Sequence, residues 1–72
     1  MTTRYELVYR PDKGTATIDR YMDDNYCVTE VSTVVHEREA ASAFAQKWGF
    51  RVGEWEKRLD VFLVAPLESL RG

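Results

Sequence analysis

Hydrophobic residues recur at helical spacing in one segment of the chain, from Glu37 to Trp48. At about 100° per residue, Ala40, Ala41, Phe44 and Ala45 fall on one face together with Trp48. The segment has no proline, no internal glycine and no β-branched residue, and alanine has the highest intrinsic helix propensity. The pattern predicts an amphipathic helix over 37–48, with Trp48 in the core.

Both ends of this helix are marked in the sequence. Glu37 places negative charge in the first turn, where the helix dipole favours it, and His36 or Thr33 is expected to cap the start. Gly49 is placed to take the left-handed conformation after the last turn. Phe50 could then fold back onto that turn as an apolar contact.

Before the helix, apolar and polar residues alternate with the period of two that is typical of half-buried strands. Arg4–Arg10 is expected to form a strand, and Pro11–Gly14 a turn in which proline presets φ and glycine supplies a left-handed exit. Thr15–Met22 is expected to return as a second strand. Tyr26–Val35 is rich in valine, threonine and tyrosine and is expected to be a third.

After the helix, Phe50–Trp55 is expected to form a fourth strand, in which Gly53 marks a bulge or a bend. Glu56–Arg58 is expected to turn the chain, although it lacks the glycine or asparagine that normally marks a hairpin. Leu59–Ala65 is the strongest strand candidate. Its apolar residues occur on both faces, which predicts a central position, and Pro66 is expected to end it.

The order β-β-β-α-β-β predicts a single α+β domain over residues 1–72, with a small antiparallel sheet and one amphipathic helix packed on one face. A chain of 72 residues has a small core, so a partner would help to stabilise it. The sheet face opposite the helix, or an exposed sheet edge, is therefore the surface on which we expect function.

Composition and charge indicate which partners and which compartment to expect. The net charge of −2 gives no electrostatic argument for binding nucleic acid or an anionic membrane. Cys27 is the single cysteine, whereas small secreted domains usually carry several disulfides, so a reducing cytoplasm is expected. The first residues contain no apolar signal sequence, and the longest apolar run, Val61–Ala65, is too short to span a bilayer.

One four-residue stretch, from Tyr21 through Met22 to Asp23 and Asp24, resembles the catalytic turn of reverse transcriptases. In that family the aspartates hold metal ions within a strand–turn–strand hairpin. The family also needs another metal-binding aspartate from a separate strand, and a nucleotide-binding framework several times this length. Neither has a counterpart here, so we interpret Asp23 and Asp24 as turn formers.

Other catalytic arrangements are equally incomplete. Cys27 and His36 are the only soft metal ligands, and a zinc site needs four ligands. Cys27 falls in an expected strand, where a free cysteine is usually a small buried hydrophobe. Glycine-rich phosphate loops and paired carboxylates are also missing, so we expect a non-enzymatic protein with no metal, no cofactor and no small-molecule substrate.

The most suggestive polar surface combines four cations with an aromatic residue: Lys47, Arg51, Trp55, Lys57 and Arg58. Arginine and tryptophan together can stack on bases and neutralise phosphates. Glu54 and Glu56 interleave with these cations, so ion pairs on a solvated hairpin account for the same residues. Both interpretations stay open at this point.

The aromatic content is high for so short a chain, and tyrosine and tryptophan left at a surface dominate protein–protein hot spots. We therefore expect a small cytoplasmic binding or regulatory protein that acts through protein–protein contacts of its sheet face or edge as a homodimer. The alternative is a small nucleic-acid-binding domain that uses residues 47–58. A viral or phage accessory gene is one source that this size suggests.

Overall fold

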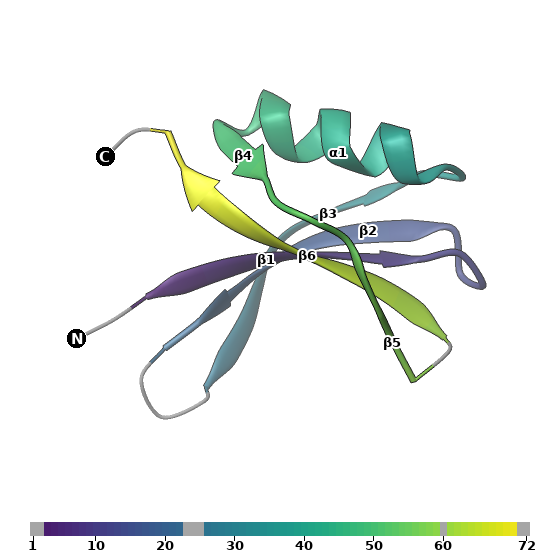
Figure 1. The fold of residues 1–72 in the computed structure, drawn as a ribbon, viewed down its shortest axis with the longest axis horizontal. Helices are drawn as coiled ribbons and strands as arrows, with labels where there is room; N and C mark the ends of the chain where they lie inside the picture. Colours follow the sequence, from purple (N-terminus) through teal and green to yellow (C-terminus); the bar gives the residue numbers. More distant parts are fainter. Residues whose placement is uncertain (1–2, 23–25, 60, 71–72) are drawn as a thin grey trace.

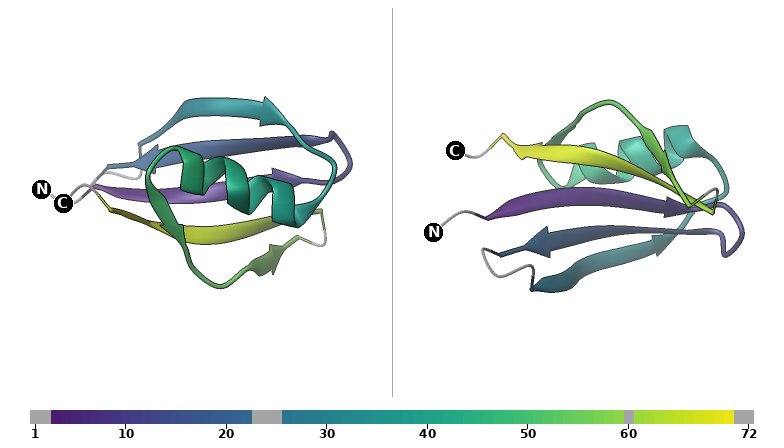
Figure 2. Two further views of the ribbon diagram at one scale, coloured as in Figure 1. Left: turned by 90° about the horizontal axis from the view of Figure 1, so that it is seen from above. Right: turned by 60° about the horizontal axis from the view of Figure 1, so that its bottom comes forward.

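The structure is a computed structural model that describes residues 3–22, 26–59 and 61–70. These residues form one antiparallel sheet with a single helix, α1, packed on one face (Figures 1 and 2). The strand order is β3-β2-β1-β6-β4, and β5 also pairs with β6. In chain order the elements are β1 (Arg4–Arg10), β2 (Thr15–Tyr21), β3 (Cys27–Val34), α1 (Arg38–Lys47), β4 (Phe50–Val52), β5 (Glu56–Arg58) and β6 (Phe62–Ser69).

The predicted α+β fold is confirmed, and β1 has the predicted bounds. The turn after β1 forms as its residues dictate, because Gly14 has a φ of 65° and donates its N–H to the carbonyl oxygen of Arg10 at 2.9 Å. Asp23 and Asp24, which we interpreted as turn formers, lie outside the described residues.

The helix also forms where its pattern places it. Gly49 has a φ of 87° and donates its N–H to the carbonyl oxygen of Gln46 at 3.0 Å, as expected for a residue that ends a helix in the left-handed region. The expected cap was wrong. Glu37 occupies the N-cap position in an extended conformation, without a side-chain cap hydrogen bond, so neither His36 nor Thr33 caps the helix.

Alanine side chains set the distance between α1 and the sheet. Ala41 and Ala45 have no exposed surface, and they contribute to the core cluster that also holds Leu7, Ile18 and Ala65. A helix face built from alanine allows its backbone to approach the strands closely. The core is correspondingly small, since Leu7 and Ile18 are its largest fully buried side chains.

The prediction that Trp48 is buried was wrong, because 51% of its surface is exposed. The helical projection placed it beside Phe44, and the structure retains that arrangement, with both residues lining a hollow beside β3. This side of α1 faces the β3 edge of the sheet, where no further described element covers it (Figure 2). Trp48 therefore lies half in solvent at the end of the helix.

Several expectations after the helix were also wrong. The strand expected over Phe50–Trp55 ends at Val52, and the strand expected to begin at Leu59 begins at Phe62. Glu56–Arg58 is the short strand β5 and not a turn. The chain turns after β5, between Arg58 and Val61. There Val61 donates its N–H to the carbonyl oxygen of Arg58 at 3.1 Å, and Leu59 has a φ of 55°. A leucine in this left-handed conformation is uncommon, and the turn lacks the glycine or asparagine that usually marks a hairpin.

Pro66 does not end the last strand, because β6 runs through it to Ser69. Gly53 donates its N–H to the carbonyl oxygen of Pro66 at 2.8 Å, so the main-chain polar groups of Pro66 face the β4–β5 edge. The missing N–H of proline therefore falls where the edge strand is already interrupted between β4 and β5. Pairing with β6 shifts by one residue across this gap, as in a bulge.

The contact between Gly53 and Pro66 generates a stability prediction. A Cβ atom on Gly53 would lie 2.7 Å from Cγ of Pro66 and 3.2 Å from its carbonyl oxygen. Since both atoms belong to a rigid strand, we expect Gly53→Ala to lower the free energy of unfolding by about 1–3 kcal/mol in urea titrations. In a Pro66→Ala background, Gly53→Ala should lower the free energy of unfolding by clearly less. An equal cost in both backgrounds would show that the contact is not the cause.

Candidate functional site

The sheet face away from α1 is largely occupied by the protein's own side chains. Val8 and Val64 are only 4% and 2% exposed there, although no described helix covers this face (Figure 1). Arg10 lies over the ring of Phe62, 4.6 Å from its centroid. Long side chains that lie flat along a sheet can exclude water from the small residues between them.

Two further pairs occupy the same face. Arg4 lies over the ring of Tyr21, 4.9 Å from its centroid, and Arg58 pairs with Glu6 at 3.6 Å between Nη2 and Oε2. A partner that docked on this face would first have to displace these contacts. The sheet face is therefore the weaker of the two predicted interaction surfaces.

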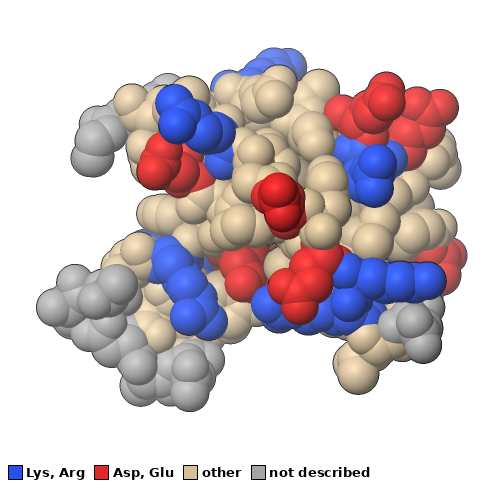
Figure 3. Space-filling view, viewed as in Figure 1, with Lys and Arg blue, Asp and Glu red and all other residues tan. Residues whose placement is uncertain are grey.

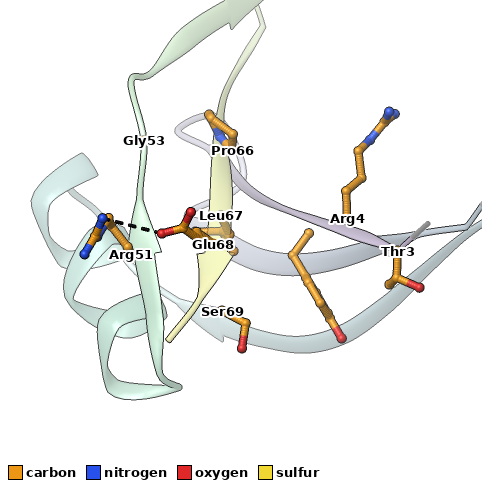
Figure 4. A pocket seen from close by; sticks show the side chains of 9 residues that line it. Thr3, Arg4, Arg51, Gly53, Pro66, Leu67, Glu68 and Ser69 are labelled. Atoms are coloured by element: carbon orange, nitrogen blue, oxygen red, sulfur yellow. Dashed lines mark ion pairs between the residues drawn. The ribbon is translucent and has the colours of Figure 1, made fainter. Parts of the chain in front are cut away.

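The β4–β5 edge is short, charged and interrupted. Acidic and basic side chains are interspersed over this side of the molecule (Figure 3). An open hollow of about 570 Å³ lies beside β4. The Arg51–Glu68 ion pair of 3.4 Å lies at one side of the hollow, and Arg4 lies at the opposite side (Figure 4). An anion in this hollow would meet the carboxylate of Glu68 as well as the arginines, so the hollow has no clear charge preference.

The structure does not gather the five suggestive residues on one surface. Arg51 and Arg58 lie on the outer sheet face, each in an ion pair with a glutamate. Lys57 is the neighbour of Arg58 in β5, so its side chain points to the opposite face. Trp55 is half-buried against the core and meets Tyr9 edge to face, with ring centroids 6.5 Å apart.

Lys47 is the remaining member of that set, and it lies elsewhere, at the end of α1. There it lines a hollow of about 520 Å³ between the helix and the edge strand β3. We call this hollow the α1–β3 groove, and its lining residues are Val31, Ser32, Thr33, Phe44, Lys47 and Trp48. Val31, Phe44 and Trp48 give it apolar walls, and Lys47 is the only charged residue among the described residues that line it, so it suits an apolar or an acidic side chain.

The edge beside this groove is open. No described strand pairs with the outer side of β3, which is eight residues long and carries one charged residue, Glu30. Native sheets usually protect a long edge with charges, proline or interruption, as the β4–β5 edge does here. A bulge in the β2–β3 pairing, between Ile18 and Asp19, disturbs the first half of the strand only.

Hydrogen bonding tells which backbone groups face outward. Val35 donates its N–H to the carbonyl oxygen of Gly14 at 3.1 Å, which makes these two residues a hydrogen-bonded pair. Because antiparallel pairing alternates, Thr33 and Val31 also direct their N–H and C=O groups toward β2. Ser32 and Val34 direct theirs away from the sheet, and Val34 is 70% exposed.

Sequence reasoning missed this combination of edge and groove. The valine- and threonine-rich run identified β3 as a strand, but which strand ends at the sheet edge depends on the order of all strands. Trp48 carried a weak signal for an exposed site, because it falls at the end of the predicted helix, where neighbouring elements cover a side chain less completely.

Among the described residues, no three His, Cys, Asp or Glu side chains lie together as a metal site. No described helix is long and apolar enough to cross a membrane.

Tyr21, on the outer sheet face, generates a pH prediction. Burial raises the pKa of Tyr21 from 10.0 to about 12, with further contributions from a hydrogen bond with Cys27 and from the negative charge of Glu6. The unfolded chain then loses this proton first, so the stabilisation is full below pH 10 and is lost as the pH rises from about 10 to about 12.

Urea titrations across this range should therefore show a smaller loss of stability in Tyr21→Phe than in the wild type. Tyr26→Phe, which removes an exposed phenol from the same β2–β3 region, is the matched control. Equal pH dependence in the two variants would contradict the assignment to Tyr21.

Comparisons with protein-family models, with curated proteins and with solved structures find no match for this chain.

Proposed function

We propose that this protein is a non-enzymatic binding protein that holds a protein partner by strand addition to the outer edge of β3. The observation that carries the proposal is the open edge over residues 31–35, beside the apolar α1–β3 groove. Strand addition obtains affinity from main-chain hydrogen bonds and specificity from pockets for alternate side chains. The edge and the groove supply these two parts.

An extended partner segment would exchange hydrogen bonds with the main chains of Ser32 and Val34, which point outward. Every second side chain of that segment would lie on the helix side of the sheet. There it would meet Phe44 and Trp48, and Lys47 would favour an acidic residue nearby. A half-exposed tryptophan on a groove wall is the type of residue that often contributes most of the affinity of an interface.

The cytoplasm is the compartment in which we propose that this binding occurs. Cys27 is exposed and forms no disulfide, and it begins the same strand that would receive the partner. In an oxidising compartment such a thiol is open to intermolecular disulfide formation. A reducing environment keeps the edge available for non-covalent pairing.

Selection of peptides from a random phage-displayed library against the immobilised protein tests the proposal. We expect enriched peptides with alternating β-branched or aromatic residues, and we expect Ser32→Pro to weaken their binding at least about tenfold, which corresponds to about 1.4 kcal/mol. The variant should fold, because the N–H of Ser32 points outward and proline is tolerated at such edge positions. Trp48→Ala should weaken the same peptides by a similar factor.

Two controls define the result. Arg51→Ala, at the opposite edge, should leave peptide affinity unchanged. Thr33→Pro removes an inward-facing N–H and should lower the free energy of unfolding, whereas Ser32→Pro should change it by less than about 1 kcal/mol. Peptides that bind Ser32→Pro and the wild type equally well would rule out the β3 edge as the binding site.

A further inference from the structure

We infer that the strand added to β3 is β3 of a second copy of this chain, paired antiparallel across a two-fold axis at Thr33. This inference rests on the proposed function, because it names the partner of the same edge. The result would be a dimer in which the two sheets join into one continuous sheet, with both helices on the same face. Such an interface is isologous, since each copy contributes the same residues.

Backbone geometry limits the possible registers. Outward-facing residues of one strand must lie opposite outward-facing residues of the other, because they exchange hydrogen bonds. In the regular half of β3 these residues are Ser32 and Val34. An axis at Thr33 sets Ser32 of each copy opposite Val34 of the other, so both outward-facing residues form hydrogen-bonded pairs.

Side-chain matching favours the same axis. On the helix side it sets Val31 opposite Val35 of the second copy, which gives two apolar pairs related by symmetry. On the outer side Val34, which is 70% exposed, meets Ser32. An axis one residue earlier, at Ser32, would instead set Val34 against Glu30 and bring the bulge into the new pairing.

Charge also fits a second copy. Residues 31–35 carry no charged side chain. The adjacent acid, Glu30, is already paired within its own chain, since its Oε1 lies 2.7 Å from Nε of Arg20. Two copies of this edge therefore meet without the like-charge repulsion that native proteins use to keep edges apart.

The small core of each copy would be enlarged by pairing. Leu7 and Ile18 are the only large side chains with essentially no exposure among the described residues, and Trp48 remains half-exposed beside the edge. The new pairing would bring Val35 of the second copy next to the α1–β3 groove, on the side of the sheet that Phe44 and Trp48 face. Dimerisation would thus extend the apolar core across the strand junction.

Disulfide trapping in the full chain tests the register. In a Cys27→Ser background, single cysteines replace each residue from Val31 to Val35 in turn, and the proteins are oxidised at a fixed concentration. Only residues on the axis face their own copy within disulfide range. Thr33→Cys should therefore give a covalent dimer in about tenfold higher yield than its neighbours. A mixture of Ser32→Cys and Val34→Cys should cross-link, whereas each alone should not.

Sedimentation velocity of the unmodified chain gives an independent readout. We expect a concentration-dependent dimer that Ser32→Pro abolishes and Arg51→Ala retains. A monomer at all concentrations without cross-links would overturn this inference. Maximum cross-linking at another position would overturn the axis at Thr33. Peptide selection decides the proposed function separately, because an edge that binds peptides but not a second copy would still be a binding edge.

Discussion

The unpaired main-chain groups at the two edges of an open β-sheet are the constraint on which this structure depends. Each edge presents N–H and C=O groups that must find water, a neighbouring element or another chain. At one edge the edge strand is interrupted between β4 and β5, which reduces the number of unpaired main-chain groups. Gly53 passes close to Pro66 at this interruption, and the proline has no N–H group. At the other edge β3 runs for eight residues, and no described strand pairs with its outer side.

The position of the helix places an apolar groove beside this open edge. Ala41 and Ala45 let α1 approach the middle of the sheet closely, so the helix covers the core cluster around Leu7 and Ile18. Its last turn then lies beside β3 without covering it, and Phe44 and Trp48 form the wall of a groove. Unpaired main-chain groups and an apolar groove lie side by side because a small helix covers only part of the sheet.

Much of the fold could be predicted from the sequence, since strong periodicity and clear turn residues coincide in its first two-thirds. The alternation over Arg4–Arg10 and the helical spacing up to Gly49 correspond to elements of the structure. The errors came where local signals were missing or were overridden by pairing. Leu59 takes a left-handed conformation that leucine seldom adopts, and Pro66 is accommodated inside a strand by the interruption opposite it.

The candidate site was harder to predict than the fold. Lys57 and Arg58 are adjacent in sequence but point to opposite faces of β5, while Arg51 and Arg58 pair with glutamates that are distant in the sequence. Which strand would become an edge depends on the order of all the strands, and this order is not a local property of the sequence. Of the five residues predicted to form a binding surface, Lys47 alone lies at the α1–β3 groove.

Amide hydrogen exchange of Ser32 and Val34, measured residue by residue at low and high protein concentration, tests the central claim most directly. If the outer edge of β3 is the interaction surface, both amides should exchange rapidly in dilute protein and become protected as the protein associates. Thr33 and Val35, whose amides face β2, should stay protected throughout. Fast exchange of Ser32 and Val34 at every concentration and with every selected peptide, or slow exchange in dilute protein, would contradict the account.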